Sequence, residues 1–123
     1  GDYYFNSCRI PWRYSMDIIL NNTPVTNELH TLNNWIKKET SSNPENIKSG
    51  YYIANDYPGK SFGHSNDLSF IAPFLVSSLI EKGNDDWTIS LWKTLINKPI
   101  TKCTFYENTL KLMAMIVATG NWN

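Results

Sequence analysis

The sequence predicts an all-α fold of about five helices, in which buried inner helices alternate with half-exposed outer helices. Two observations carry this prediction. Apolar residues recur at helical spacing in one segment after another, and no segment shows the alternation of a convincing strand. The segments also differ in character: the third and fifth are apolar around most of the helix, whereas the second and fourth have one polar face.

Each predicted helix has a local reason. The first, residues 11–21, begins at a proline, whose missing N–H would be unpaired in a first turn anyway. The second, from residue 26 to about 38 or 39, ends in two lysines that complement the helix dipole. The third, residues 70–82, must hold its proline in the first turn, and the fourth, residues 87 to about 97, stops before a proline. The fifth, residues 107–119, is almost wholly apolar and ends at a glycine.

The polar stretch between the second and third helices is predicted to form no sheet. Residues 51–53 look like a short extended segment. Residues 55–67 contain Asp, Pro, Gly, Ser and Asn without periodicity, and are predicted to form a surface loop. Loops of this length are often functional.

The predicted inner helices lack partners within this chain. Five helices are too few to close a two-layer ring, so the inner helices would expose large apolar faces. The sequence therefore predicts that the chain is a piece of a larger structure or that it associates.

Length and charge bound the class of protein. A chain of 123 residues fits one domain with a modest core. Its 11 acidic and 11 basic residues balance, so neither nucleic acid nor an acidic membrane surface is an expected partner. No apolar run reaches the roughly 18 to 20 residues that span a bilayer. There is no signal-peptide pattern, but Gly1-Asp2 looks like a truncation point, so this absence does not define the compartment.

The cysteines and histidines do not form a metal-binding pattern. Cys8 and Cys103 match neither a disulfide framework nor a zinc signature, and no metal or other cofactor is expected. A single bridge between the two cysteines and two free thiols both remain open. His30 falls on the polar side of its helix, where solvation explains it, whereas His64 lies in the long loop and could touch a ligand.

The stretch richest in chemistry is residues 3–13, which holds four aromatic rings, two arginines and an amide. Rings stack on sugar faces while polar groups hold hydroxyls, so this composition suits a sugar-binding cleft. The alternative is an aromatic core segment with two surface arginines. Arg13 and Asp17 are one helical turn apart, which favours a structural ion pair, and Arg9, just before the helix, is the better candidate for a cleft residue.

Hydrolysis of a glycosidic bond generally needs two carboxylates. The carboxylates near the segments of interest are Asp2, Asp17, Asp56, Asp67 and Glu107. Spacing singles out none of them. Ser7 has no base nearby in the sequence, so serine hydrolase chemistry is not expected.

The segment from Tyr4 to Arg13, followed by Asp17, resembles the signature near the start of the C-terminal third of glycoside hydrolase family 8. The likeness continues in the same order along nearly the whole chain. Its further segments are Asn34-Trp35-Ile36, Asn43-Pro44-Glu45-Asn46-Ile47 with Gly50-Tyr51, Phe70-Ile71-Ala72-Pro73-Phe74, Tyr106-Glu107-Asn108-Thr109-Leu110-Lys111-Leu112 and Gly120-Asn121-Trp122. That family includes endoglucanases, lichenases, chitosanases and reducing-end xylanases.

The resemblance implies that residues 1–123 are the C-terminal part of a single (α/α)6-barrel catalytic domain and supply about its last five helices. It implies a secreted, inverting, endo-acting hydrolase of β-linked glucan or chitosan, with an acid and a base about 6.5 to 9.5 Å apart. The general acid of the family belongs to the N-terminal part of the domain. The expected partners are therefore the polysaccharide substrate and that missing part.

In the endoglucanase branch the general base is an Asp three residues before the first Arg of the signature, and here that position holds Asn6. An amide cannot accept a proton at neutral pH, so Asn6 cannot be the base, and this chain alone is predicted to be inactive. The resemblance leaves Asn6 to hold water or a sugar hydroxyl, and Arg9 to orient the base or neutralise charge. Tyr4 and Tyr106 are candidates to contact substrate, with packing as the alternative for each.

Two other classes of protein compete with the hydrolase. Asn6 also fits a non-catalytic carbohydrate-binding module that keeps the aromatic and amide cleft. Exposed apolar helices fit a helical interaction module that dimerises. A Glu-bearing region upstream of Gly1 would support the enzyme, and a native start near Gly1 would support a binding or interaction module.

Overall fold

The computed structural model describes residues 1–54, 57–83 and 85–122. This part of the chain contains five α-helices and one two-stranded antiparallel sheet. The helices are α1 (Ile10–Asn21), α2 (Thr26–Glu39), α3 (Leu68–Ser78), α4 (Asp85–Asn97) and α5 (Phe105–Ala118). The strands are β1 (Lys48–Tyr51) and β2 (Ser61–Ser65), and the short 3-10 turns are η1 (Asn6–Arg9), η2 (Pro44–Asn46) and η3 (Ile100–Lys102).

The predicted all-α fold, as a portion of an (α/α)6 barrel, is wrong for this chain, which is a mixed α/β fragment. β1 and β2 pair with Gly50 opposite Phe62 and Tyr51 opposite Ser61. β2 occupies part of the stretch that was predicted to be a loop, of which residues 55 and 56 lie outside the described residues. Each strand contains a glycine, and the two strands together hold three serines, which hides the alternation that identifies a strand.

α3 and α5, the two helices predicted to form an inner layer, both begin earlier in the sequence than predicted. Asp67 caps α3 by accepting a hydrogen bond from the Ser69 N–H, so the helix begins at Leu68 and Pro73 lies inside it rather than in its first turn. α5 begins at Phe105 because Thr104 and Glu107 form a reciprocal capping box. Capping side chains, rather than the first apolar residue, thus set both helix starts.

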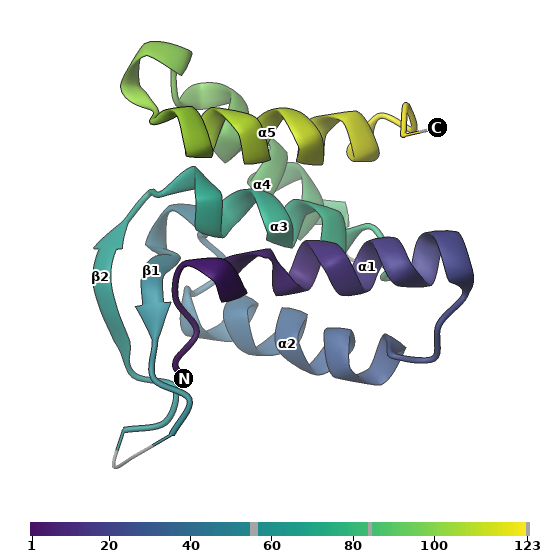
Figure 1. Ribbon diagram of the computed structural model, residues 1–123, viewed down its shortest axis with the longest axis horizontal. Coiled ribbons are helices and arrows are strands. Elements are labelled where there is room, and N and C mark those ends of the chain that lie inside the picture. Colours follow the sequence, from purple (N-terminus) through teal and green to yellow (C-terminus); the bar gives the residue numbers. More distant parts are fainter. Residues whose placement is uncertain (55–56, 84, 123) are drawn as a thin grey trace.

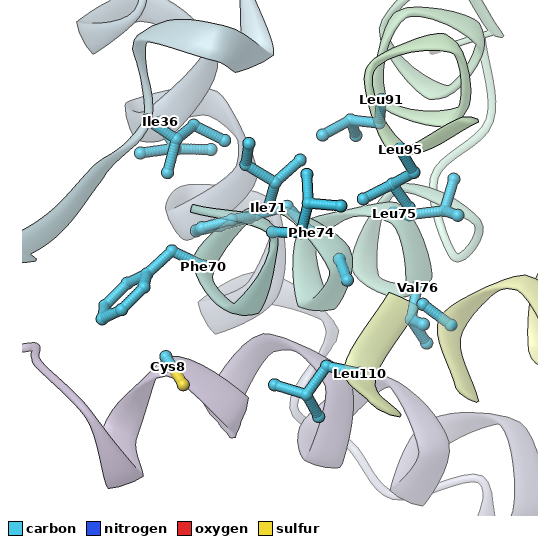
Figure 2. Close-up of a cluster of buried hydrophobic side chains, with 14 of the residues drawn as sticks. Cys8, Ile36, Phe70, Ile71, Phe74, Leu75, Val76, Leu91, Leu95 and Leu110 are labelled. Atoms are coloured by element: carbon cyan, nitrogen blue, oxygen red, sulfur yellow. The ribbon is translucent and has the colours of Figure 1, made fainter. Parts of the chain in front are cut away.

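α3 forms the centre of the core. All of its residues are buried, and α1, α2, α4 and α5 pack around it. Figure 2 shows Ile36 of α2 and Leu91 of α4 on one side of α3, with Cys8 on the other. The prediction that the third helix is buried on most sides is confirmed.

α5 behaves differently from α3. Its buried residues are Glu107, Leu110, Ala114 and Val117. Phe105 is 89% exposed and Leu112 is 61% exposed, although the sequence of the helix is apolar nearly all round. Only one face of α5 is therefore covered by the described part of the chain. No helix among the described residues is long and apolar enough to cross a membrane.

Three helices begin at the same end of the molecule. α1, α3 and α5 run in one direction, with their N-termini on the side where β1 and β2 lie, and α2 and α4 return the chain (Figure 1). Polar residues that precede or cap these three helices are thereby collected at one end, although they are far apart in the sequence.

Candidate functional site

Asn6 and Arg9 lie together at the start of the first helix. Asn6 is exposed and has a positive φ of 30°, a region that asparagine tolerates better than most residues. The Arg9 guanidinium donates from Nε to the Asn6 carbonyl oxygen at 3.4 Å and from Nη2 to Asn6 Oδ1 at 3.5 Å. The second of these bonds turns the Oδ1 side of the Asn6 amide toward Arg9, whereas the first is made to the backbone.

Tyr106 reaches this end of the molecule from the first turn of α5. Its hydroxyl lies 3.5 Å from Cys8 Sγ, across 98 positions of sequence. Burial raises the pKa of Tyr106 to about 12, with the contact to Cys8 and the negative charge of Asp67 adding to it and the Arg9 cation opposing it. Tyr106 is therefore a neutral phenol at ordinary pH and can donate a hydrogen bond.

The structure thus brings three of the four predicted site residues, Asn6, Arg9 and Tyr106, to the N-terminal ends of α1 and α5. The fourth, Tyr4, is 45% exposed and belongs to a cluster of rings. Its ring centroid lies 4.7 Å from that of Phe5 and 5.3 Å from that of Phe62. The Tyr4 ring is therefore partly packed and partly exposed, and its contact with substrate stays a prediction.

The two cysteines are free thiols, so the alternative of a single bridge between them is not realised. Cys8 is fully buried, and burial raises the pKa of its thiol. Cys8 is the buried residue of η1 and contacts Tyr106, which makes it a packing residue of the site.

The predicted ion pair between Arg13 and Asp17 is absent from the described part of the chain. Asp17 instead accepts a hydrogen bond from Asn21 Nδ2 at 2.7 Å, one turn further along α1. This bond, with a second from Thr23, holds the pKa of Asp17 below its usual value. Arg13 is exposed.

Glu107 is a structural carboxylate. It is 6% exposed, and its Oε1 accepts from Lys98 Nζ at 2.6 Å and from the Leu68 N–H at 3.1 Å. Its Oε2 accepts from the Thr104 N–H at 2.7 Å. Glu107 thereby ties the start of α3 to the start of α5, and both of its oxygens are engaged within the protein.

The remaining candidate carboxylates differ in position. Asp2 accepts a hydrogen bond from the Ile53 N–H at 3.2 Å, which fastens the N-terminus beside β1. Asp56 lies outside the described residues. Asp67 is 7% exposed and caps α3, close enough to Tyr106 and Cys8 to raise the pKa of both. Asp67 therefore shares an end of the molecule with Asn6 and Arg9, as Glu107 does.

The histidines also separate. His30 is largely exposed, as predicted, but it is not merely solvated, because its Nδ1 lies 3.0 Å from Glu81 Oε1 and its Nε2 lies 2.9 Å from Asn34 Nδ2. His64 is on β2 and its Nε2 lies 3.6 Å from Asp67 Oδ2. Sequence reasoning gave His64 little weight and did not pair it with Asp67. Their spacing of three residues, directly before an apolar run, was the available signal. Among the described residues no group of three or more His, Cys, Asp or Glu is arranged to hold a metal ion.

Comparison with known proteins gives relatives that this chain resembles along nearly its whole length. It is 36% identical over 123 residues to a β-glucanase of Niallia circulans, covering 99% of this chain and 29% of that protein. It is 28% identical over 124 residues to an endoglucanase of Bacillus sp. strain KSM-330, covering 98% of this chain and 25% of that protein.

A solved structure is also similar. The apo structure of a β-1,3-1,4-glucanase from Paenibacillus sp. X4 superposes with a TM-score of 0.86 at 35% sequence identity, covering 100% of this chain and 31% of that one. The chain therefore spans less than a third of the length of each of these proteins.

No family model matches the chain. The predicted assignment to glycoside hydrolase family 8 is corrected, because the similar proteins are named as a β-glucanase, an endoglucanase and a β-1,3-1,4-glucanase, and the described fold is a mixed α/β fragment. What the comparisons give in its place is similarity, over the whole of this chain, to a part of bacterial proteins named as β-glucanases and an endoglucanase.

Proposed function

We propose that this chain is part of a glucan-hydrolysing enzyme, in which residues 1–123 belong to one catalytic domain and form one wall of its glycan-binding site. The observation that carries the proposal is the gathering of Asn6, Arg9 and Tyr106 at one end of the molecule. The names of the similar proteins support glycoside hydrolysis as the reaction.

Each residue of this wall has a role that its environment supports. The half-exposed Tyr4 ring offers an apolar face on which a sugar ring stacks. The Asn6 amide, oriented by Arg9, holds a sugar hydroxyl or the attacking water. Arg9 supplies positive charge beside the reacting centre, and Tyr106 donates a hydrogen bond from a phenol that stays neutral.

The catalytic acid and base lie, under this proposal, in another part of the enzyme. Asn6 cannot accept a proton, and Glu107 is fully engaged by Lys98 and two backbone N–H groups. The missing part of the domain is thus the expected partner. The exposed side chains of Ile100, Phe105 and Leu112 offer it an apolar surface.

The substrate class proposed is a β-linked glucan, with chitosan as the second candidate. A polymeric glucan is too large to enter a cell, which supports the proposal that the enzyme is secreted. The inverting stereochemistry stays a prediction, and it is tested by following the anomeric configuration of the first product by proton NMR.

The test is an assay of this chain alone on lichenan, carboxymethylcellulose and chitosan, next to the longer protein that contains it. We expect turnover from the longer protein and none above background from the 123-residue chain. Turnover by the chain alone would show that its own residues supply both carboxylates and would overturn the proposed division of roles.

The competing proposals are a non-catalytic carbohydrate-binding module and a helical interaction module. The apolar surface on α5 favours the second of these. Sedimentation of the chain distinguishes the helical interaction module from the wall of a glycan site. An interaction module associates without glycan, whereas a wall of a glycan site binds oligosaccharide as a monomer.

A further inference from the structure

His64 and Asp67 form a polar pair that the proposed roles above do not use. The side chain of His64 is 74% exposed and that of Asp67 is 9% exposed. His64 Nε2 and Asp67 Oδ2 are 3.6 Å apart, which is longer than a hydrogen bond. An exposed imidazole thus stands over a buried carboxylate, with a gap between their polar atoms.

A serine fixes the imidazole from its other side. Ser49 Oγ accepts a hydrogen bond from the His64 backbone N–H at 3.0 Å and lies 3.5 Å from His64 Nδ1. Because the oxygen of Ser49 already accepts from that N–H, its O–H is available to donate to Nδ1. When that O–H donates to Nδ1, the proton of the neutral imidazole is on Nε2, the nitrogen that faces Asp67.

The backbone conformation around Gly63 allows the contact between Ser49 and His64. The register of the sheet shifts between Lys48 and Gly50, and such bulges re-aim side chains. Gly63 has a φ of +76°, and a Cβ there would lie 2.2 Å from Ser49 Oγ. Only glycine therefore lets Ser49 reach the His64 N–H, and the left-handed turn directs the next residue, His64, toward the cap of α3.

Asp67 keeps one oxygen available. Its Oδ1 accepts from both the N–H and the hydroxyl of Ser69. Its Oδ2 accepts no hydrogen bond from residues 1–54, 57–83 or 85–122. An oxygen atom that lies to one side of the line joining these two atoms can be within hydrogen-bond distance, about 2.8 Å, of both.

We propose that His64 Nε2 and Asp67 Oδ2 together bind one hydroxyl group of a neutral glycan. A hydroxyl accepts from Nε2–H through its oxygen and donates its own proton to the carboxylate, which satisfies both atoms at once. An anionic ligand is disfavoured by Asp67, and a cation is disfavoured by the N–H. The inference rests on the proposed function, because Asp67 caps α3 at the same end of the molecule where Tyr106 lies in the first turn of α5.

The test uses the full 123-residue chain and a β-1,3-1,4-linked glucose tetrasaccharide, followed by NMR of the imidazole nitrogens. We expect the His64 nitrogen signals to shift saturably on titration. His30 is the internal control, because it is also largely exposed but lies on α2 beside Glu81, and its signals should not move.

Two variants sharpen the result. His64→Phe keeps an aromatic ring at an exposed position but removes Nε2–H. We expect the affinity for the tetrasaccharide to fall about tenfold, which is the usual cost of one lost hydrogen bond. Asp67→Asn keeps the size and capping ability of the side chain and should weaken binding by a similar factor. His30→Phe is the matched control and should bind like the wild-type chain.

The outcomes are distinguishable. If the wild-type chain binds the tetrasaccharide but His64→Phe binds equally well and the His64 signals stay in place, the hydroxyl-binding pair is refuted and the proposed function stands. If the wild-type chain binds no glucan at millimolar concentration, the proposed function fails, and the inference that rests on it fails too.

Discussion

Glu107 and Asp67 are two buried carboxylates at neighbouring helix N-termini, and the protein satisfies them differently. Both are nearly inaccessible, at 6% and 7% exposure. Glu107 uses both oxygens, which accept from the Lys98 ammonium and from backbone N–H groups of Leu68 and Thr104. Asp67 uses one oxygen to cap α3 and leaves the other toward the exposed His64.

This difference separates a structural carboxylate from one with capacity for a ligand. A buried charge is tolerated when every lone pair has a partner, and then it locks the elements that it joins. A buried carboxylate with an unused oxygen keeps part of its desolvation cost uncompensated until something binds. The comparison predicts that changes around Glu107 act on stability, whereas changes around Asp67 act on glycan binding.

The largest effect is expected from Lys98→Met. This change leaves the Glu107 carboxylate buried without its cation and should lower the free energy of unfolding by about 3 kcal/mol. Urea unfolding followed by circular dichroism measures it. Lys102→Met is the matched control, since Lys102 is an exposed lysine on the adjoining η3 turn, and it should change stability by less than about 0.5 kcal/mol. Equal effects of the two changes would remove Glu107 from the structural class.

A smaller effect, with a distinctive pH dependence, is expected from Glu107→Gln. Burial alone would raise the pKa of Glu107, but the bonds from Lys98, Thr104 and Leu68 outweigh it and hold the pKa below its ordinary value of 4.5. A folded-state pKa below the unfolded one gives stability that is present above about pH 4.5 and lost as the pH falls through the folded value. Glu107→Gln should therefore cost about 2 kcal/mol at pH 7.

That cost should shrink as the pH is lowered below 4.5, because the unfolded chain then takes up a proton on Glu107 before the folded protein does, and the folded carboxyl is protonated only at its own lower pKa. Urea unfolding of both proteins at pH 7, 5, 4 and 3 measures the difference. A difference that stays constant down to pH 3 would contradict the assigned role of the charge.

The sequence anticipates the helices better than the strands, for physical reasons. α2 and α4 are amphipathic, so periodicity places them within one or two residues of where they lie. The sequence pattern does not predict the sheet, because its stability comes from pairing across a bulge and from Phe62 lying over Gly50. A Cβ at Gly50 would be 2.1 Å from the Phe62 ring. Such long-range contacts leave no local periodic signal.

The same distinction holds for the site. Asn6 and Arg9 are three residues apart, and their contact follows from one turn of helix. Tyr106 is predicted as a site residue only from the resemblance to a family, since its spacing from Cys8 in the sequence does not indicate that the two lie close together. His64 and Asp67 needed the positive φ of Gly63 and the hydroxyl of Ser49 to meet, and neither is visible without the fold. The exposure of Phe105 likewise depends on what packs against α5, which apolarity alone does not reveal.

The smallest effect on stability is expected at Asp67, and this is where the comparison is most exposed to refutation. Asparagine caps helices as well as aspartate does, so Asp67→Asn should change the free energy of unfolding by less than about 0.5 kcal/mol. Asp67→Ala removes the cap itself and should cost about 1 kcal/mol. The two variants therefore differ in stability, yet both lack the carboxylate oxygen that faces His64 and should lose glycan affinity alike. If Asp67→Asn bound glycan as tightly as the wild-type chain and only Asp67→Ala bound more weakly, Asp67 would have a structural role like that of Glu107.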